Sequence, residues 1–164
     1  MSYGTPNYQG ADDGFDIIRI GGNEYYKVYN DTAGKLTDGT LKVLEWFDDA
    51  DSLGVYPTLG APATDTALDQ RVVVIQNILN NAVTGIADAT WGFVQIMGYC
   101  PTITAATGGV TNEQYLEVLN AGTKATDDGA TLTGRSFGLA KATALVDVNF
   151  AGVLFGRYVA VAAS

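Results

Sequence analysis

Apolar and β-branched residues recur along this chain in short runs that glycine-containing turns separate. Residues 15–20 and 24–29 form two such runs, and the Gly21-Gly22-Asn23 segment between them is typical of a β-hairpin turn. A second turn at residues 37–39 precedes a run over 40–47, in which Leu41 and Val43 alternate with their neighbours. The pattern predicts three strands in this part of the chain.

The rest of the chain predicts further strands around two less regular stretches. Residues 48–66 combine two prolines and two glycines with acidic side chains, which indicates a loop or linker. Residues 72–80 begin with a β-branched run, but the periodicity leaves helix and strand equally open. A turn is expected at Asp127-Asp128-Gly129, and strands are expected at residues 90–98, 101–105, 115–119, 136–141, 145–150 and 152–161.

Strands this short, spaced about ten residues apart, are typical of an all-β barrel or sandwich. We expect three regions: an extended arm over residues 1–14, an acidic β-hairpin region and linker over 15–66, and a compact core over 67–164. A chain of 164 residues buries enough surface to fold without a metal ion or a disulfide.

Charged residues are few and are unevenly distributed along the chain. Only 16% of residues are charged and 47% are apolar, and the formal net charge is −9. Residues 1–70 hold 12 acidic and 4 basic side chains, a net of −8, whereas residues 71–164 hold 6 and 5, a net of −1. Nucleic acid is excluded as a partner, because binding to phosphates requires clustered Lys and Arg.

No membrane association is expected from the sequence. The N-terminus lacks the basic stretch and apolar run of a signal peptide, so we expect no export by that route. The most apolar segment, residues 142–163, contains Asp147, Asn149 and Arg157, and burying such side chains in a bilayer is costly. The segment is therefore interpreted as strands.

The residue types that most enzymes and metal sites require are missing. The chain has no histidine and one cysteine, Cys100, which is expected to be a buried apolar residue rather than a reactive thiol. Residues 134–138, Gly-Arg-Ser-Phe-Gly, match the G-x-S-x-G turn of hydrolases, but Ser136 has no histidine to take its proton, and only proximity suggests Lys141 as a substitute. We expect no catalytic, cofactor-binding or metal-ligating residue.

The acidic segments also have simpler explanations than a site. Residues 48–60 resemble a calcium-binding loop only in part, because Leu53 and Gly60 stand where oxygen ligands are required. Asn30-Asp31-Thr32 fits a glycosylation triplet but is most simply a turn. Packing is the default for the aromatic residues, although they could also line a sugar site or a protein interface: Tyr25, Tyr26, Tyr29, Trp46, Phe47 and Trp91.

A resemblance to a family lies in the second half of the chain. Residues 85–100, GIADATWGFVQIMGYC, give a G-x-A element followed by an aromatic-Val-Gln strand, and Gly138-Leu139-Ala140 gives a second G-x-A element before the closing strand at 152–161. In these motifs residues 85–161 resemble the small β proteins that decorate the heads of tailed bacteriophages. The acidic residues 1–70 have no counterpart in the short members of that family.

The resemblance implies a capsid decoration, or cement, protein. Such a protein is a trimeric β-barrel or sandwich on the outer surface of the virion, made in the host cytoplasm, and it bridges subunits of the major capsid protein. Two alternatives remain open at this point. One is another virion part, such as a tail-tube, head-completion or fibre component, and the other is a carbohydrate-binding module that uses the aromatic residues.

Overall fold

The computed structural model describes residues 17–49, 54–76 and 85–163, and within these ranges every regular element is a β-strand. The arm expected at residues 1–14 lies outside the described residues. Twelve strands follow in chain order: β1 (Ile17–Ile20), β2 (Asn23–Asn30), β3 (Leu41–Asp49), β4 (Gly54–Gly60), β5 (Asp65–Gln70), β6 (Val72–Ile75), β7 (Thr90–Thr104), β8 (Tyr115–Val118), β9 (Ala125–Gly129), β10 (Gly138–Ala140), β11 (Asn149–Phe155) and β12 (Val159–Val161).

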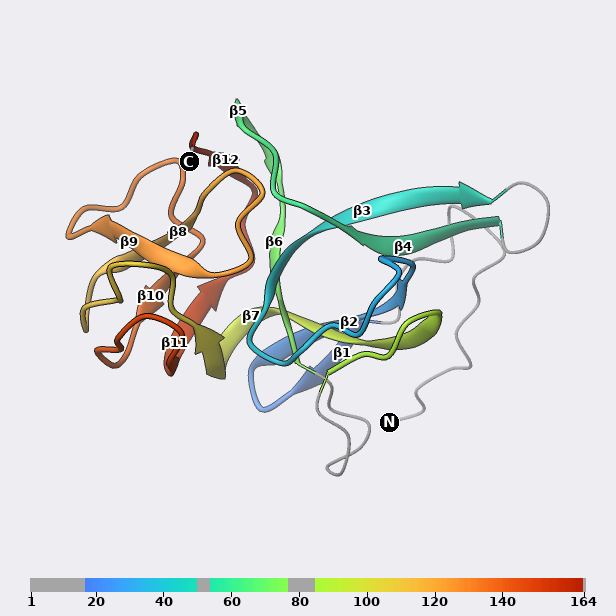
Figure 1. The fold of residues 1–164 in the computed structure, drawn as a ribbon, viewed down its shortest axis with the longest axis horizontal. Coiled ribbons are helices and arrows are strands. Elements are labelled where there is room, and N and C mark those ends of the chain that lie inside the picture. The colour runs from blue at the N-terminus through green and yellow to red at the C-terminus, as the bar shows by residue number, and fades with distance from the viewer. Residues whose placement is uncertain (1–16, 50–53, 77–84, 164) are drawn as a thin grey trace.

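Ten of these strands form one antiparallel sheet in the order β4-β3-β6-β7-β11-β10-β8-β9, with β2 also paired to β7 and β1 to β2. The sheet curls into a half-barrel, and β5 and β12 form a separate two-stranded sheet. Figure 1 shows β8 to β11 at one end of the molecule and β3 and β4 at the other, with β6 between them, and β7 runs from the β11 end to lie beside β2. The all-β fold and the N-terminal hairpin expected from the sequence are confirmed.

Strand β6 is buried on both faces because it separates two hydrophobic clusters. Val72 and Val74 belong to the cluster at the β8–β11 end, whereas Val73 and Ile75 belong to the cluster under β2. Alternate side chains of a strand point to opposite faces, so a continuous β-branched run can serve two cores. This resolves residues 72–75 as strand, and residues 77–84 lie outside the described residues.

Strand β7 is long enough to serve both clusters, and it does so by bending. Val94 and Ile96 pack in the cluster under β2, and Ile103 packs in the other. At the bend, the buried Gln95 side chain donates Nε2 hydrogen bonds to the carbonyls of residues 97 and 99, at 3.2 and 2.9 Å. Gly98 between them has φ of 94°, a conformation that favours glycine. The strands expected at 90–98 and 101–105 are therefore one bent strand.

The loop predicted over residues 48–66 is wrong, because the end of β3, the whole of β4 and the start of β5 lie in that stretch. Strand β4 pairs with β3 over seven positions, with Pro57 opposite Trp46. Proline cannot donate a backbone hydrogen bond, but β4 ends the strand order of its sheet and has a described neighbour on one side only. Pro57, Gly54 and Gly60 thus belong to an edge strand, whereas Pro62 lies in the irregular stretch that follows it.

Three further expectations in the second half need correction. Residues 127–129 are not a turn but the end of β9, where Asp127 pairs with Leu116 of β8. Of residues 145–150, only the last two are in β11, and the first four form a loop. The strand expected over 152–161 is two strands, because the chain turns at Gly156, which has φ of 66°.

Strand pairing connects the two expected parts of the chain, since β2 pairs with β7 and β3 pairs with β6. The expected start of the core, residue 67, lies inside β5. The described part of the chain holds no helix of the length and apolar character that crossing a membrane requires.

Candidate interaction surface

The loop between β10 and β11 is firmly held at both ends. Ala144 is buried and exchanges two backbone hydrogen bonds of 2.8 Å with Val110. Three residues later, the N–H of Asp147 donates to the carbonyl of Ala105 at 3.0 Å, and the N–H of Ala105 donates to the carbonyl of Val148 at 3.1 Å. A further bond from the N–H of Val148 to the carbonyl of Leu145, 3.1 Å, closes the turn.

This loop carries three exposed aliphatic side chains, and we call residues 145–148 the aliphatic loop. Leu145 is 75% exposed, Val146 46% and Val148 48%. Single exposed apolar residues are common on proteins, but three of them on one anchored turn form a compact apolar tip. The tip lies on the loop between β10 and β11 in Figure 1.

A polar hollow of about 370 Å³ borders the aliphatic loop at Asp147. The Lys124 ammonium forms an ion pair with the Asp147 carboxylate, and the Thr104 hydroxyl donates to Asn149 Oδ1 at 2.9 Å. An apolar centre with a polar, partly charged rim is the usual anatomy of a protein interface. The hollow is lined by Thr37, Asp38, Thr40, Thr104, Thr123, Lys124, Asp147 and Asn149.

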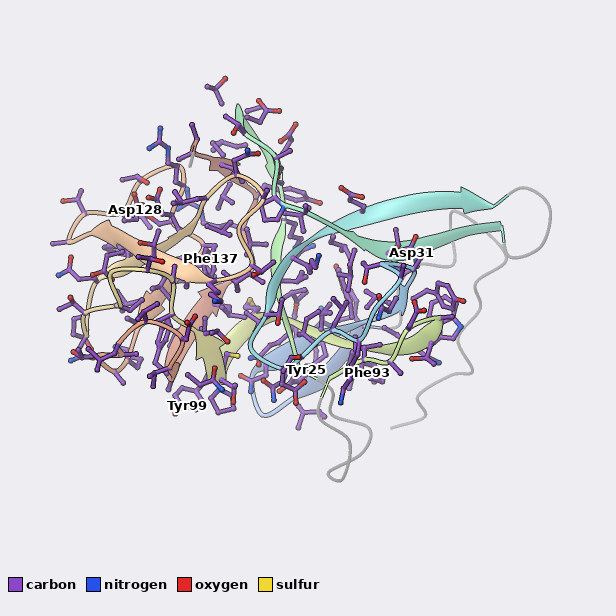
Figure 2. All side chains as sticks on the ribbon, in the orientation of Figure 1. Tyr25, Asp31, Phe93, Tyr99, Asp128 and Phe137 are labelled. Carbon is purple, nitrogen blue, oxygen red and sulfur yellow. The ribbon has the colours of Figure 1, made fainter. Side chains whose placement is uncertain are left out.

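The serine of the G-x-S-x-G match has a structural role. Ser136 is fully buried, its hydroxyl donates to Asp128 Oδ2, and it accepts the N–H of Thr133 at 2.9 Å. The Lys141 ammonium forms its ion pair elsewhere, with Glu113 at 3.1 Å. Figure 2 places Asp128 and Phe137 of this region at the β8–β10 end of the molecule. The bonds of Ser136 fix the turn between β9 and β10.

Glu117 of β8 is partly buried and lies within electrostatic reach of the Asp128 carboxylate. Burial, followed by the negative charge of Asp128, raises the pKa of Glu117, while Arg135 acts in the opposite direction. The Oε2 atom of Glu117 is buried without a hydrogen-bond partner among the described residues. The ionised form of Glu117 is therefore less favourable in the folded protein than in the unfolded chain.

We predict that Glu117→Gln raises the melting temperature at pH 7, by roughly 1 °C because solvent screens this half-exposed group. A carboxyl whose folded-state pKa is raised costs stability once the pH exceeds its unfolded value, and the cost is complete above the folded value. The gain should therefore vanish near pH 3.5, where Glu117 is protonated in both states. Thermal melts of both proteins at pH 3.5 and pH 7 test this, and an equal gain at both would contradict it.

Neither the cysteine nor the acidic side chains described form a metal site. Cys100 is fully buried, and burial raises the pKa of its thiol to about 12. In the part of the chain that the structure covers, no three His, Cys, Asp or Glu side chains lie close enough to hold a metal ion. The calcium-like segment falls largely on undescribed side chains, although the backbone of Asp48 and Asp49 pairs in β3.

The remaining sequence candidates are mostly packed into the fold. Tyr25 and Tyr26 are buried, and the rings of Tyr29 and Trp91 lie 5.2 Å apart at a tilt of 60°. The Asn30 side chain is fully buried, so the glycosylation triplet is not a surface acceptor. The side chains of Trp46 and Phe47 lie outside the described residues.

The aliphatic loop is the feature that the sequence did not reveal. Its alternation of Leu145, Val146 and Val148 with Asp147 equally fits a half-buried strand. A turn signal is also missing, because the residue with positive φ in the loop, 62°, is Asp147 rather than a glycine.

Comparisons of the chain with protein-family models, with curated proteins and with solved structures find no match.

Proposed function

We propose that this chain is a structural virion protein that decorates and stabilises a bacteriophage capsid, as a homotrimer, by bridging subunits of the major capsid protein. It acts on the outer capsid surface and catalyses no reaction. The observation that carries the proposal is the aliphatic loop, an anchored apolar tip with a polar rim. The motifs in which residues 85–161 resemble phage decoration proteins support the major capsid protein as the partner.

The physical demands of cementing a shell match these features. A cement protein needs contact area and a fixed shape, because its binding energy comes from an interface repeated many times over the shell. The backbone bonds at Ala144, Asp147 and Val148 hold the aliphatic loop in one conformation, so little conformational entropy is lost on binding. A preformed apolar tip suits a static partner.

The polar groups nearest to enzyme motifs are committed to the fold, which supports a non-catalytic role. Ser136 and Thr133 both hydrogen bond to Asp128, and Asp127 accepts the N–H of Thr111 at 3.1 Å. A hydroxyl whose proton is held by a half-buried carboxylate, in a chain without histidine, lacks the base that acyl transfer needs.

Binding to expanded heads prepared without this chain tests the proposal. Wild-type protein should be a trimer, or a multiple of trimers, in light scattering and should sediment with the heads. Leu145→Asp should weaken binding by roughly tenfold or more, because a leucine buried in an interface contributes about 1.5–3 kcal/mol. The matched control is Leu132→Asp, since Leu132 is 50% exposed on a turn outside the aliphatic loop.

The variants should behave as a contrasting pair. Leu132→Asp should bind heads like wild type, and both variants should melt like wild type because both positions are exposed. Wild-type protein that is monomeric and does not sediment with heads would contradict the proposed function. Equal weakening in both variants would contradict the assignment of the aliphatic loop as the contact.

A further inference from the structure

Strand β1 is an edge strand that is open to solvent on both faces. Within the described ranges it pairs only with β2, in regular antiparallel register from Ile17 opposite Tyr26 to Ile20 opposite Asn23. Ile17 is 38% and Ile20 50% exposed, and Ile18 is partly buried. A regular edge strand with three isoleucines is a ready template for another strand, and soluble proteins usually protect such edges.

The hairpin geometry determines which backbone groups point outward. Gly21 and Gly22 both have positive φ, 56° and 85°, as in the two-residue type I′ turn. In such a hairpin the closing pair, Ile20 and Asn23, is hydrogen bonded, and hydrogen-bonded pairs alternate with non-hydrogen-bonded ones. Ile18 and Ile20 therefore bond to β2, and the N–H and C=O groups of Ile17 and Arg19 point to the open edge.

We propose that β1 pairs with β1 of a second copy of this chain, antiparallel across a twofold axis. The outward groups belong to Ile17 and Arg19, so the hydrogen-bonded pairs must join these positions between copies. The register in which both positions form hydrogen-bonded pairs places Ile17 opposite Arg19 of the second copy. Ile18 then lies opposite Ile18 of the second copy. This pairing is independent of the proposed function, because it concerns a different surface and needs no capsid.

The side chains fit this register. Ile18 and Ile20 point to the same face, so the two copies bring four isoleucines together there, in facing and diagonal positions. The next register, with Arg19 opposite Arg19, would place like charges face to face.

Charge and shape also favour this edge for self-association. The chain has a net charge of −9, yet β1 holds no acidic residue, and its one cation is neutralised by the 2.6 Å ion pair between Arg19 and Glu24. Among the described residues, no atom lies within 4 Å of where a side chain would begin on Gly21 or Gly22, so the turn leaves room for a second strand. The edge is thus a nearly neutral patch on an acidic protein.

Disulfide trapping of the full chain tests the pairing. Facing Cα atoms of a non-hydrogen-bonded antiparallel pair are about 4.5 Å apart, within the range that a disulfide spans. Ile18→Cys should therefore form a disulfide-linked dimer on mild oxidation, seen on a non-reducing denaturing gel. The native thiol gives little background, because Cys100 is buried and its pKa is raised to about 12.

Ile20→Cys is the matched control, since Ile20 is more exposed but lies four residues out of register with its counterpart. That offset separates the two Cα atoms by about 13 Å, too far for a disulfide. Ile18→Cys should give roughly ten times more dimer than Ile20→Cys under the same oxidation. Equal dimer from both variants, or dimer from neither, would overturn the proposal, and the latter is expected if β1 is covered by another partner.

A second pair of substitutions tests the backbone contacts in the Ile18→Cys protein. Arg19→Pro removes an outward N–H without touching the pairs to β2, and Arg19→Ala removes the same ion pair but keeps the N–H. The proline variant should lose most of the cross-linking, and the alanine variant should keep it. Melting curves check that both remain folded, and equal cross-linking in folded proline and alanine variants would contradict strand pairing.

Discussion

Asn30→Ala should destabilise the protein by about 3–5 kcal/mol, the largest effect we expect from a single truncation. Asn30 is fully buried, and its Nδ2 donates to the carbonyls of Gly34, Ile86 and Ala87 at 2.8, 3.1 and 3.0 Å. Its Oδ1 accepts the N–H and the hydroxyl of Thr32 at 3.1 and 2.7 Å. Truncation removes these five hydrogen bonds from a buried site, although the carbonyls of Ile86 and Ala87 keep those from the Leu36 N–H and the Thr90 hydroxyl. Urea unfolding curves measure the loss.

Asn30→Asp separates the contribution of the donated hydrogen bonds to stability from that of the side chain's shape, because it keeps the shape and removes the amide donor. The introduced carboxylate keeps the acceptor but faces three carbonyl oxygens, so its ionised form is disfavoured and its folded-state pKa is raised. At pH 7 this variant should be at least as unstable as Asn30→Ala, and it should recover part of the loss as the pH falls through that raised pKa. A variant as stable as wild type at pH 7 would show that the amide donor is dispensable.

Ile96→Ala and Ile103→Ala should each cost about 2–5 kcal/mol, or roughly 4–20 °C in melting temperature. The two residues lie on the same strand, β7, but Ile96 packs in the cluster under β2 and Ile103 in the cluster at the β8–β11 end. Strands β6 and β7 supply side chains to both clusters, so the clusters should unfold together.

Circular dichroism and tryptophan fluorescence provide the measurement, because both tryptophans, Trp46 and Trp91, lie in the first 91 residues. The two signals should give coincident transitions for wild type and for both variants. The contradicting result is two separate transitions, in which Ile103→Ala shifts the transition seen by circular dichroism but not the one seen by fluorescence. It would mean that the two ends of the sheet fold independently.

Local signals explain why much of the sheet was predictable from the sequence. The glycine pair at 21–22 identified the first hairpin, and the alternation around Leu41 and the aromatic run after Thr90 identified β3 and β7. In each case the turn chemistry and the side-chain period agree with the tertiary structure. The strand β8 was found for the same reason.

The errors arise where the tertiary environment decides between equal local patterns. Pro57 suggests a loop, but at an edge its missing N–H costs nothing. The run at 72–75 fits a helix or a strand, and only its position between two clusters makes it β6. The bend of β7 depends on Gln95, whose hydrogen bonds to residues 97 and 99 form only in the folded chain.

The candidate site could not be predicted for a related reason. The exposure of Leu145, Val146 and Val148 follows from the bridge between Ala144 and Val110, a contact between residues 34 positions apart. The sequence identified Ser136 as a chance motif match, and its hydrogen bond to Asp128 agrees with a structural role. Interaction surfaces depend on what the fold leaves uncovered, which periodicity alone does not reveal.

An image reconstruction of expanded heads incubated with the purified protein tests the central claim most directly. We predict regular threefold density on the outer shell, with the aliphatic loop of each copy facing the major capsid protein. Decorated heads on which residues 145–148 face solvent would contradict the proposed contact. Undecorated heads at saturating protein would contradict the proposed function itself.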